Sequence, residues 1–328
     1  MRKISSILLT VCIAALVSSG SAAAPRFEKV SDHCYYIEPS PGGAIVGAVV
    51  TAGGVLLINP PAQPVLDTVL EAMKRLTAKP PTWIVNTDYQ VESAGGSEHL
   101  AAQDATVIAS REQRQLPATP AQGDGNNTVS QRKDERAPGQ KGETSPRFYF
   151  TKQMRLFPDG LEIKVVAVGA KARTAGDLVV FVPAEKVLYT GNLFQPGSYP
   201  EIDATEGDGS ALGWIDGMRR VVEMVPLLKS AMPPPKPDPS KPQPEEKTLE
   251  EQVVVVPGSG AQSNLQDVKD LLEAAHKLRS EISKLLSSGR TTRESFLSSP
   301  SLGPFRSYTN FEAFANRLYD ELAAQKPK

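Results

Sequence analysis

Short apolar runs alternate along the chain with segments in which apolar residues recur at helical spacing. Residues 44–50 and 55–59 are apolar and β-branched and are joined by Gly53 and Gly54, which predicts a hairpin. Further strands are predicted at residues 83–86, 105–108, 148–150, 154–157, 161–168, 178–182, 187–189 and 253–256. Apolar residues three and four apart predict helices at residues 64–76, 98–103, 214–228, 264–286 and 311–322. Strands in each half, with helices between and after them, favour two packed sheets with helices outside.

Three polar stretches interrupt these elements. Residues 112–147 have no sustained hydrophobic period, which indicates a polar insertion of low order. Residues 232–246 are rich in proline and charge and indicate an extended, solvated loop. Residues 286–307 mix serine, glycine, proline and threonine with short apolar patches, and we expect irregular structure there with one short helix.

Residues 1–24 have the three-part layout of a secretory signal peptide. Arg2 and Lys3 precede an apolar run, and small residues follow it. The run is shorter than the about 20 residues of a transmembrane helix, although an uncleaved anchor is the alternative. Pro25 obstructs cleavage directly before it, so we expect a cut near Ala23.

The mature chain is then expected to be exported, either periplasmic or extracellular, with no stable membrane insertion. Residues 25–328 are predicted to form one domain that contains the insertion and the proline-rich loop.

The charge balance argues against one class of partner. The 328 residues carry a formal net charge of −1, and without Arg2 and Lys3 the chain keeps 34 basic residues against 37 acidic ones. No basic cluster is interleaved with aromatic residues, and no strong field would attract nucleic acid or an anionic membrane. We therefore expect no nucleic-acid partner.

Cysteine and histidine are scarce. Cys12 falls in the expected signal peptide, so Cys34 would be the only cysteine of the mature chain. Cys34 lies in an apolar stretch, which predicts a buried, unreactive thiol. His33 is poorly placed as its base, because adjacent residues of a strand point to opposite faces. The other histidines, His99 and His276, are expected in surface or packing roles on helices.

Four sequence blocks follow one another with consistent spacing. They are Asn-Thr-Asp-Tyr-Gln-Val-Glu-Ser-Ala-Gly-Gly (86–96), Ala-Arg-Thr-Ala-Gly-Asp (172–177), Thr-Gly-Asn (190–192) and Val-Pro-Gly-Ser-Gly (256–260). They resemble Asn-Thr-His-x-His-x-Asp-His-x-Gly-Gly, Ala-His-Thr-x-Gly-Asp, Thr-Gly-Asp and Val-Pro-Gly-His-Gly of the metallo-β-lactamase superfamily. Asn59 also stands where the family has an aspartate. The resemblance spans residues 26–322 and includes features of a secreted subgroup.

The resemblance implies an α/β (α+β) fold, a four-layer αβ/βα sandwich of two mixed sheets flanked by helices. It also implies zinc, bound by His, His, Asp, His, His, Asp and His. In this sequence those positions hold Asp88, Gln90, Glu92, Ser93, Arg173, Asn192 and Ser259. Zinc hydrolases need neutral imidazoles around the metal and an open position for water. Because no histidine stands at a ligand position, we expect no zinc cofactor.

Other chemistry at these positions is weakly supported. Oxygen donors would suit calcium, magnesium or manganese, but Arg173 would put a permanent cation in the same space. Ser93 or Ser259 would lack a motif histidine as base. We therefore predict no catalytic residue and interpret the seven positions as a vestigial pocket.

Three functions follow as hypotheses. The first is a non-catalytic pseudo-hydrolase that binds a small ligand or a protein partner. The second is a hydrolase of this superfamily that uses an atypical metal site or no metal. The third is an interaction module that docks through its proline-rich loop.

Two structural expectations accompany the hypotheses. The segments that carry the four blocks, residues 83–96, 172–177, 190–194 and 257–260, should converge at one edge of the sandwich, where functional loops gather on a rigid scaffold. Arg173 should pair with Asp88 or Glu92 and replace the metal as the link between loops; the alternative is that it points into solvent.

Overall fold

The computed structural model describes residues 24–40, 42–113, 148–169, 171–203, 209–225, 252–289 and 292–325. Nearly all of the predicted signal peptide, nearly all of the polar insertion and the whole proline-rich loop lie outside these residues. Within the described residues, no helix is both long and apolar enough to cross a membrane.

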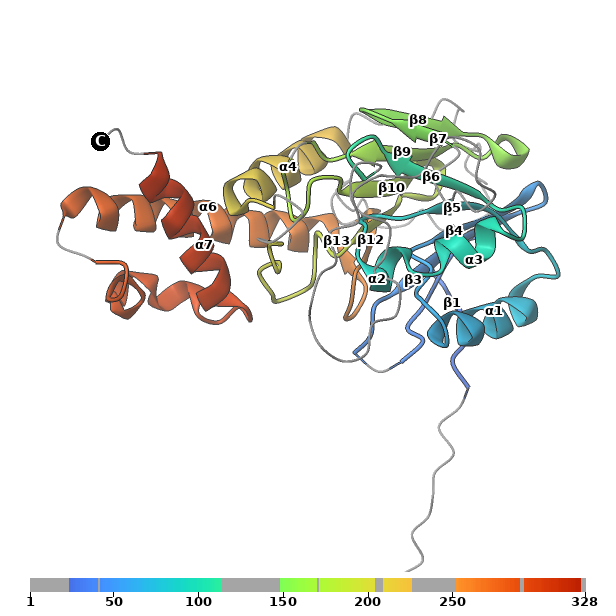
Figure 1. The fold of residues 1–328 in the computed structure, drawn as a ribbon, viewed down its shortest axis with the longest axis horizontal. Helices are drawn as coiled ribbons and strands as arrows, with labels where there is room; N and C mark the ends of the chain where they lie inside the picture. The colour runs from blue at the N-terminus through green and yellow to red at the C-terminus, as the bar shows by residue number, and fades with distance from the viewer. Residues whose placement is uncertain are drawn as a thin grey trace, which may run out of the picture.

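Two mixed sheets face each other (Figure 1). The first sheet has the order β1-β2-β3-β4-β5-β6-β7, antiparallel as far as β4 and parallel from β4 to β7. Its strands are β1 (Glu28–Lys29), β2 (Cys34–Ile37), β3 (Val46–Thr51), β4 (Gly54–Ile58), β5 (Pro81–Val85), β6 (Thr106–Ser110) and β7 (Phe148–Phe150). The predicted hairpin is β3 and β4.

The second sheet has the order β13-β12-β11-β10-β9-β8 and is antiparallel except between β11 and β12. Its strands are β8 (Gln153–Leu156), β9 (Ile163–Ala167), β10 (Leu178–Val182), β11 (Val187–Gly191), β12 (Val254–Pro257) and β13 (Ser263–Asn264). Side chains alternate across each strand, so one face of each sheet packs between the sheets and the other packs under helices. In β4, for example, Leu56 and Ile58 lie in the core between the sheets, whereas Val55 and Leu57 lie under α1.

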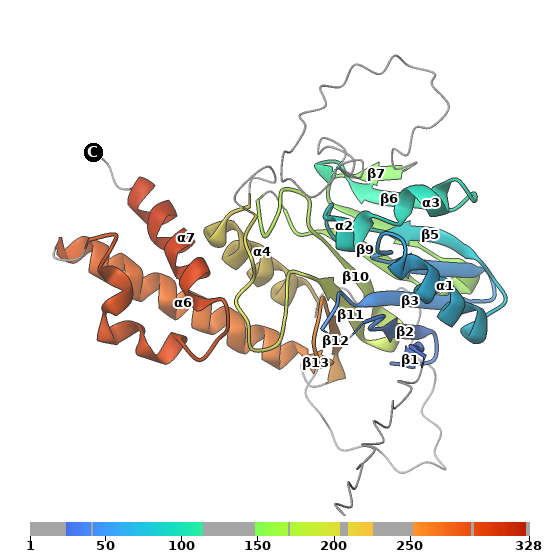
Figure 2. The same ribbon diagram turned by 60° about the horizontal axis from the view of Figure 1, so that its bottom comes forward.

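Helices cover both outer faces (Figure 2). The first sheet is covered by α1 (Val65–Leu76) and α3 (Ser97–Ala101), preceded by the short α2 (Val91–Ala94). The second sheet is covered by α4 (Ala211–Met224) and α6 (Leu265–Ser288). The structure therefore confirms the predicted four-layer sandwich. In the described residues, the short 3-10 helices η2 (Pro158–Gly160) and η3 (Pro183–Glu185) connect strands.

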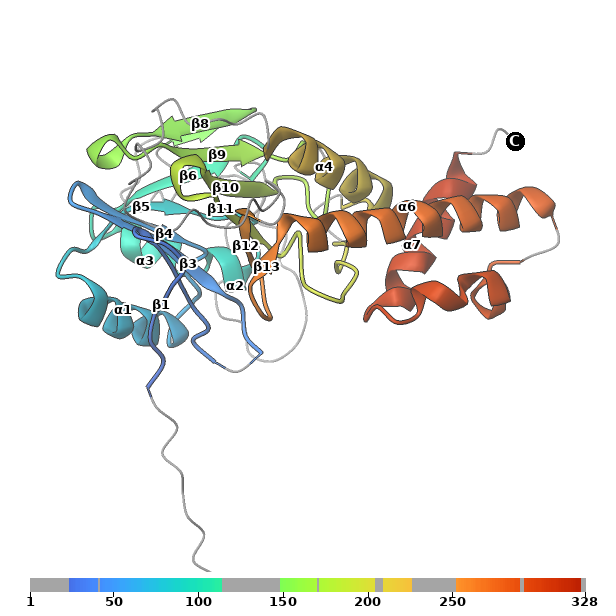
Figure 3. The same cartoon turned by 180° about the vertical axis from the view of Figure 1, so that it is seen from behind.

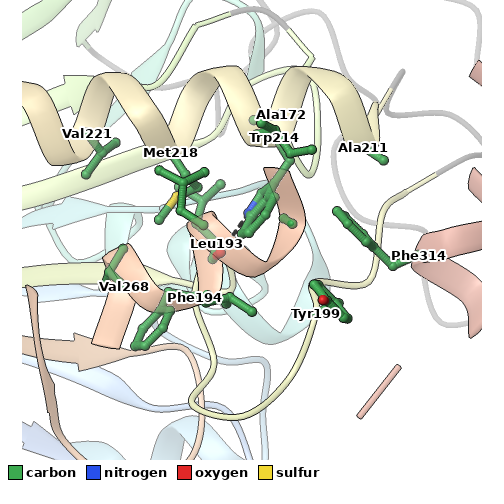
Figure 4. Packing of buried hydrophobic residues seen from close by; sticks show 14 of the residues in the cluster. Ala172, Leu193, Phe194, Tyr199, Ala211, Trp214, Met218, Val221, Val268 and Phe314 are labelled. Atoms are coloured by element: carbon green, nitrogen blue, oxygen red, sulfur yellow. Dashed lines mark hydrogen bonds between the residues drawn. The ribbon is translucent and has the colours of Figure 1, made fainter. Parts of the chain in front are cut away.

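The C-terminal helices extend well beyond the sandwich (Figure 3). Here α7 (Phe311–Ala324) packs on α6 and α4, after the 3-10 helices η5 (Phe296–Ser298) and η6 (Pro300–Phe305). Among the described residues of the stretch 286–307 there are thus two short helices rather than the expected one. Trp214 of α4 joins this region to the sandwich: its ring meets Phe314 of α7 edge-on at 5.5 Å, and its Nε1 donates to Leu193 O at 2.8 Å (Figure 4).

One carboxylate ties α7 to the start of α4. Glu321 accepts hydrogen bonds from Ser210 Oγ (2.7 Å), Ala211 N (3.0 Å) and Leu212 N (3.0 Å). These backbone groups have no partner within their own helix, and negative charge is favourable at a helix N-terminus. Ser210 N in turn donates to Ala172 O (2.9 Å), so the C-terminal region is connected to the loop that carries Arg173.

Candidate functional site

The loop after β5 carries the first block, and packing explains its framing residues. Asn59, which follows β4 with a left-handed backbone (φ 58°), donates to Thr87 Oγ1 (2.9 Å) and accepts from Thr87 N (2.7 Å). Gly96 has no space for a side chain, because a Cβ there would lie 2.5 Å from Pro61 O. Asn59 thus anchors the loop between β5 and α2 at Thr87, and the next residue, Asp88, is buried.

The second block lies between β9 and β10. Asp177 closes this turn by accepting from Thr174 N and from Thr174 Oγ1, both at 2.7 Å. The carbonyl oxygen of Arg173 accepts from Asp203 N at 3.0 Å. Hydrogen bonds thus hold the backbone at and after Arg173, and the Arg173 side chain is buried.

The third and fourth blocks meet the first one directly. Gly191 ends β11 with φ 53°, and a Cβ on it would lie 2.0 Å from Thr87 Oγ1. A Cβ on Gly258 would lie 2.4 Å from Asn192 Oδ1. Leu178 N, directly after the second block, donates to Thr87 O at 2.7 Å. The expected convergence of the four blocks at one edge is confirmed.

A buried hydrogen-bond network joins five of the seven predicted positions. Arg173 Nη1 lies 3.3 Å from Asp88 Oδ2, and the two side chains are 5% and 1% exposed. Arg173 Nη2 donates to Gln90 Oε1. Asn192 Nδ2 donates to Asp88 Oδ2 (3.3 Å) and lies 3.5 Å from Ser93 Oγ. The expected pairing of Arg173 with Asp88 is confirmed, and the outward-pointing alternative is wrong.

The other two positions lie at the rim. Glu92 is exposed on α2, so it is not the carboxylate that Arg173 contacts. Ser259 is half-buried beside Gly258. Sequence reasoning gave Asp88 and Glu92 equal weight as partners of Arg173, and the structure selects Asp88.

Burial also alters the acidity of a neighbouring group. Burial raises the pKa of Asp177 to about 7, and the negative charge of Asp88 adds to this effect. Hydrogen bonds from Thr174 and the charge of Arg173 act in the opposite direction. The site thus holds two buried carboxyl groups beside one guanidinium, and a pKa of about 7 for Asp177 means that its protonation below that pH would balance the charge.

The side chains that meet here do not fit the zinc that the resemblance implies. Zinc sites are built from imidazole, thiolate and carboxylate ligands, and of these the five joined side chains offer only the Asp88 carboxylate. That carboxylate is paired with Arg173, whose fixed positive charge repels a dication at contact distance. In the described part of the chain, no three His, Cys, Asp or Glu side chains are grouped so that they could hold a metal.

Cysteine and histidine lie away from this centre. Cys34 is fully buried, as expected, and burial raises the pKa of its thiol. His33 contacts Glu185 at the opposite end of β10 and β11. His99 lies 2.8 Å from Gln103 on the surface of α3. Burial and nearby arginines lower the pKa of His276 on α6.

Sequence reasoning missed two groups that line the site. Gln113, assigned to the polar insertion, is buried and its Nε2 donates to Asn86 O (3.0 Å) and Gly176 O (2.8 Å), which links the first two blocks. Tyr89 donates from its hydroxyl to Asp203, and burial raises the pKa of that phenol. Gln113 lies in no recognisable motif, and Tyr89 stands in the first block at a position where the resembled pattern has no fixed residue, so the resemblance indicated neither of them.

Comparison with known proteins identifies the fold. No protein-family model and no curated protein sequence matches the chain. Solved structures do match: a metallo-β-lactamase from Pontibacter korlensis, at 17% identity, aligns over 77% of this chain and 99% of its own with a TM-score of 0.55. The DIM-1 metallo-β-lactamase, at 15% identity, covers 77% and 97% with a TM-score of 0.52. TMB-1, at 16% identity, covers 78% and 99% with a TM-score of 0.54. The chain therefore has the metallo-β-lactamase fold.

Proposed function

We propose that this chain is an exported, non-catalytic protein of the metallo-β-lactamase fold, a pseudo-hydrolase that binds a small ligand or a protein partner in the periplasm or outside the cell. One observation carries the proposal: the Arg173 guanidinium lies 3.3 Å from Asp88, buried among the four loops. A guanidinium keeps its proton in a protein, so it can serve neither as a metal ligand nor as a base. The seven positions are then a vestigial zinc site.

The accessible surface beside this centre is formed by α2. Val91 is 47% exposed and Glu92 is exposed, whereas Asp88 and Arg173 are buried. Ligand contact at this edge would therefore involve the rim around α2 and not the Asp88–Arg173 centre.

The test uses the full-length chain expressed with its N-terminal segment. Intact mass of the periplasmic fraction is expected to show a chain that begins near Ala24. That material is then assayed with ester, lactam and lactone reporters, beside an active zinc metallo-β-lactamase as positive control. We expect no turnover above buffer. Turnover that Arg173→Ala changes, but that the surface variant Arg219→Ala does not, would establish an enzyme and end the proposal; so would retention of an uncleaved chain in the cytoplasm.

A further inference from the structure

The side chains around the Arg173 guanidinium are arranged as a binding site for a planar cation. Two acceptors on the first block, Asp88 Oδ2 and Gln90 Oε1, receive hydrogen bonds from two different terminal nitrogens of the guanidinium. Of the lysine and arginine side chains, only the arginine guanidinium presents two parallel N–H donors in one plane, since the lysine ammonium acts as a point charge.

The Asp88 carboxylate is held in place without help from Arg173. Asp88 Oδ1 accepts from Gln90 N at 3.0 Å, and Asp88 Oδ2 also accepts from Asn192 Nδ2 at 3.3 Å. Asp88 is 1% exposed, so its carboxylate is poorly hydrated and requires a partner cation. Thus the anion and its orientation would persist if the arginine side chain were absent, with the Gln90 side chain beside it to supply the second acceptor.

We infer that the centre of the four loops is a guanidinium-binding site, occupied in this chain by its own Arg173, which accepts a free alkylguanidinium once that side chain is removed. This inference goes beyond the proposed function and stands apart from it, because it concerns which cation the site holds. A divalent metal is the poorer occupant: Asp88 is the single carboxylate at the contact, and hard cations bind through several oxygen ligands in a near-complete shell.

The experiment measures thermal unfolding of Arg173→Ala with and without methylguanidinium, which replaces the lost end of the side chain. The variant is expected to have a melting temperature about 5–15 °C below that of the unaltered chain. About 10 mM methylguanidinium should recover about a third of this loss, the extent expected for a small ligand with a dissociation constant of about 1 mM. The unaltered chain and Arg219→Ala, which removes an arginine from an exposed ion pair, should not respond.

Three control compounds test which chemical properties of methylguanidinium are needed for the recovery. Methylurea has the planar shape without the positive charge. Methylammonium has the positive charge without the planar pair of N–H donors, and Mn²⁺ represents a hard metal ion. Recovery by any of these to the same extent as by methylguanidinium would overturn the inference, as would no recovery at all.

A second variant keeps the inference testable if Arg173→Ala does not fold. Arg173→Lys retains the charge but not the fork, so its melting temperature is expected to fall by about 3 °C or more. A lysine variant as stable as the unaltered chain would contradict a guanidinium-specific site. Hydrolysis of a reporter, by contrast, would count against the proposed function and leave this inference standing.

Discussion

Replacing Arg173 with alanine is expected to lower the free energy of unfolding by about 3–5 kcal/mol, because the change leaves a buried carboxylate without its cation. Asp88 is 1% exposed, and its remaining donors are the Asn192 amide and a backbone N–H. Most of the lost free energy of unfolding therefore comes from leaving the Asp88 carboxylate buried without a cation, and not from the net contribution of the Arg173–Asp88 pair.

A double-mutant cycle separates these two contributions. Asp88→Asn removes the stranded charge, so the double variant Arg173→Ala/Asp88→Asn should lose at least about 1 kcal/mol less than the sum of the single losses. Urea unfolding at constant pH supplies the four free energies. The exposed pair Arg219–Glu223, at 3.0 Å, is the matched control and should couple by about 0.5 kcal/mol or less. Additivity at Arg173 and Asp88 within about 0.5 kcal/mol would show that the pair is not a structural link.

The second large effect is a dependence of stability on pH that comes from Asp177. Its folded-state pKa is raised from 3.8 to about 7, chiefly by burial. Between these two values the folded chain holds a proton that the unfolded chain has released. The stabilisation from this group is thus fully present below about pH 4 and is lost as the pH rises through 7. The size of the effect is a few kcal/mol, roughly 1.4 kcal/mol for each unit of pKa shift.

Asp177→Asn isolates this contribution, because asparagine has the same shape and does not titrate. The unfolding free energy of the unaltered chain minus that of the asparagine variant should fall steadily between pH 4.5 and about 7.5. Taking this difference removes opposing contributions from other groups, such as His276, whose lowered pKa stabilises the fold as the pH rises. A difference that stays constant across this range would mean that Asp177 is ionised throughout.

The fold could be read from the sequence because β-branched runs and helical spacing record which faces are buried. Residues 178–182 were predicted as a strand, and β10 has these bounds. Helix ends were less accurate: the helix predicted from residue 214 begins at Ala211, because Ser210 caps it by accepting from Gly213 N at 2.9 Å. This cap is a hydrogen bond between a serine side chain and a backbone N–H three residues later in the chain, so the spacing of apolar residues does not indicate it.

The site was predictable only as far as the motif blocks reach. Spacing located all seven positions, but it could not decide between Asp88 and Glu92, since both are acidic residues of one loop. The short helix α2 decides it, with Asp88 buried before its start and Glu92 on its exposed side. Gln113 and Asp203 join the site from distant parts of the chain, and such contacts exist only once the sheets have packed.

The central claim is that Arg173 takes the place of the metal, and metal content tests it most directly. The purified mature chain is equilibrated with excess zinc, desalted, and analysed by inductively coupled plasma mass spectrometry beside an active metallo-β-lactamase treated in the same way. The account predicts bound zinc far below one ion per chain, because the carboxylate at the centre is already paired and the other ligand positions hold no imidazole. One or more tightly bound metal ions per chain, located at Asp88 by their loss in Asp88→Asn, would contradict it.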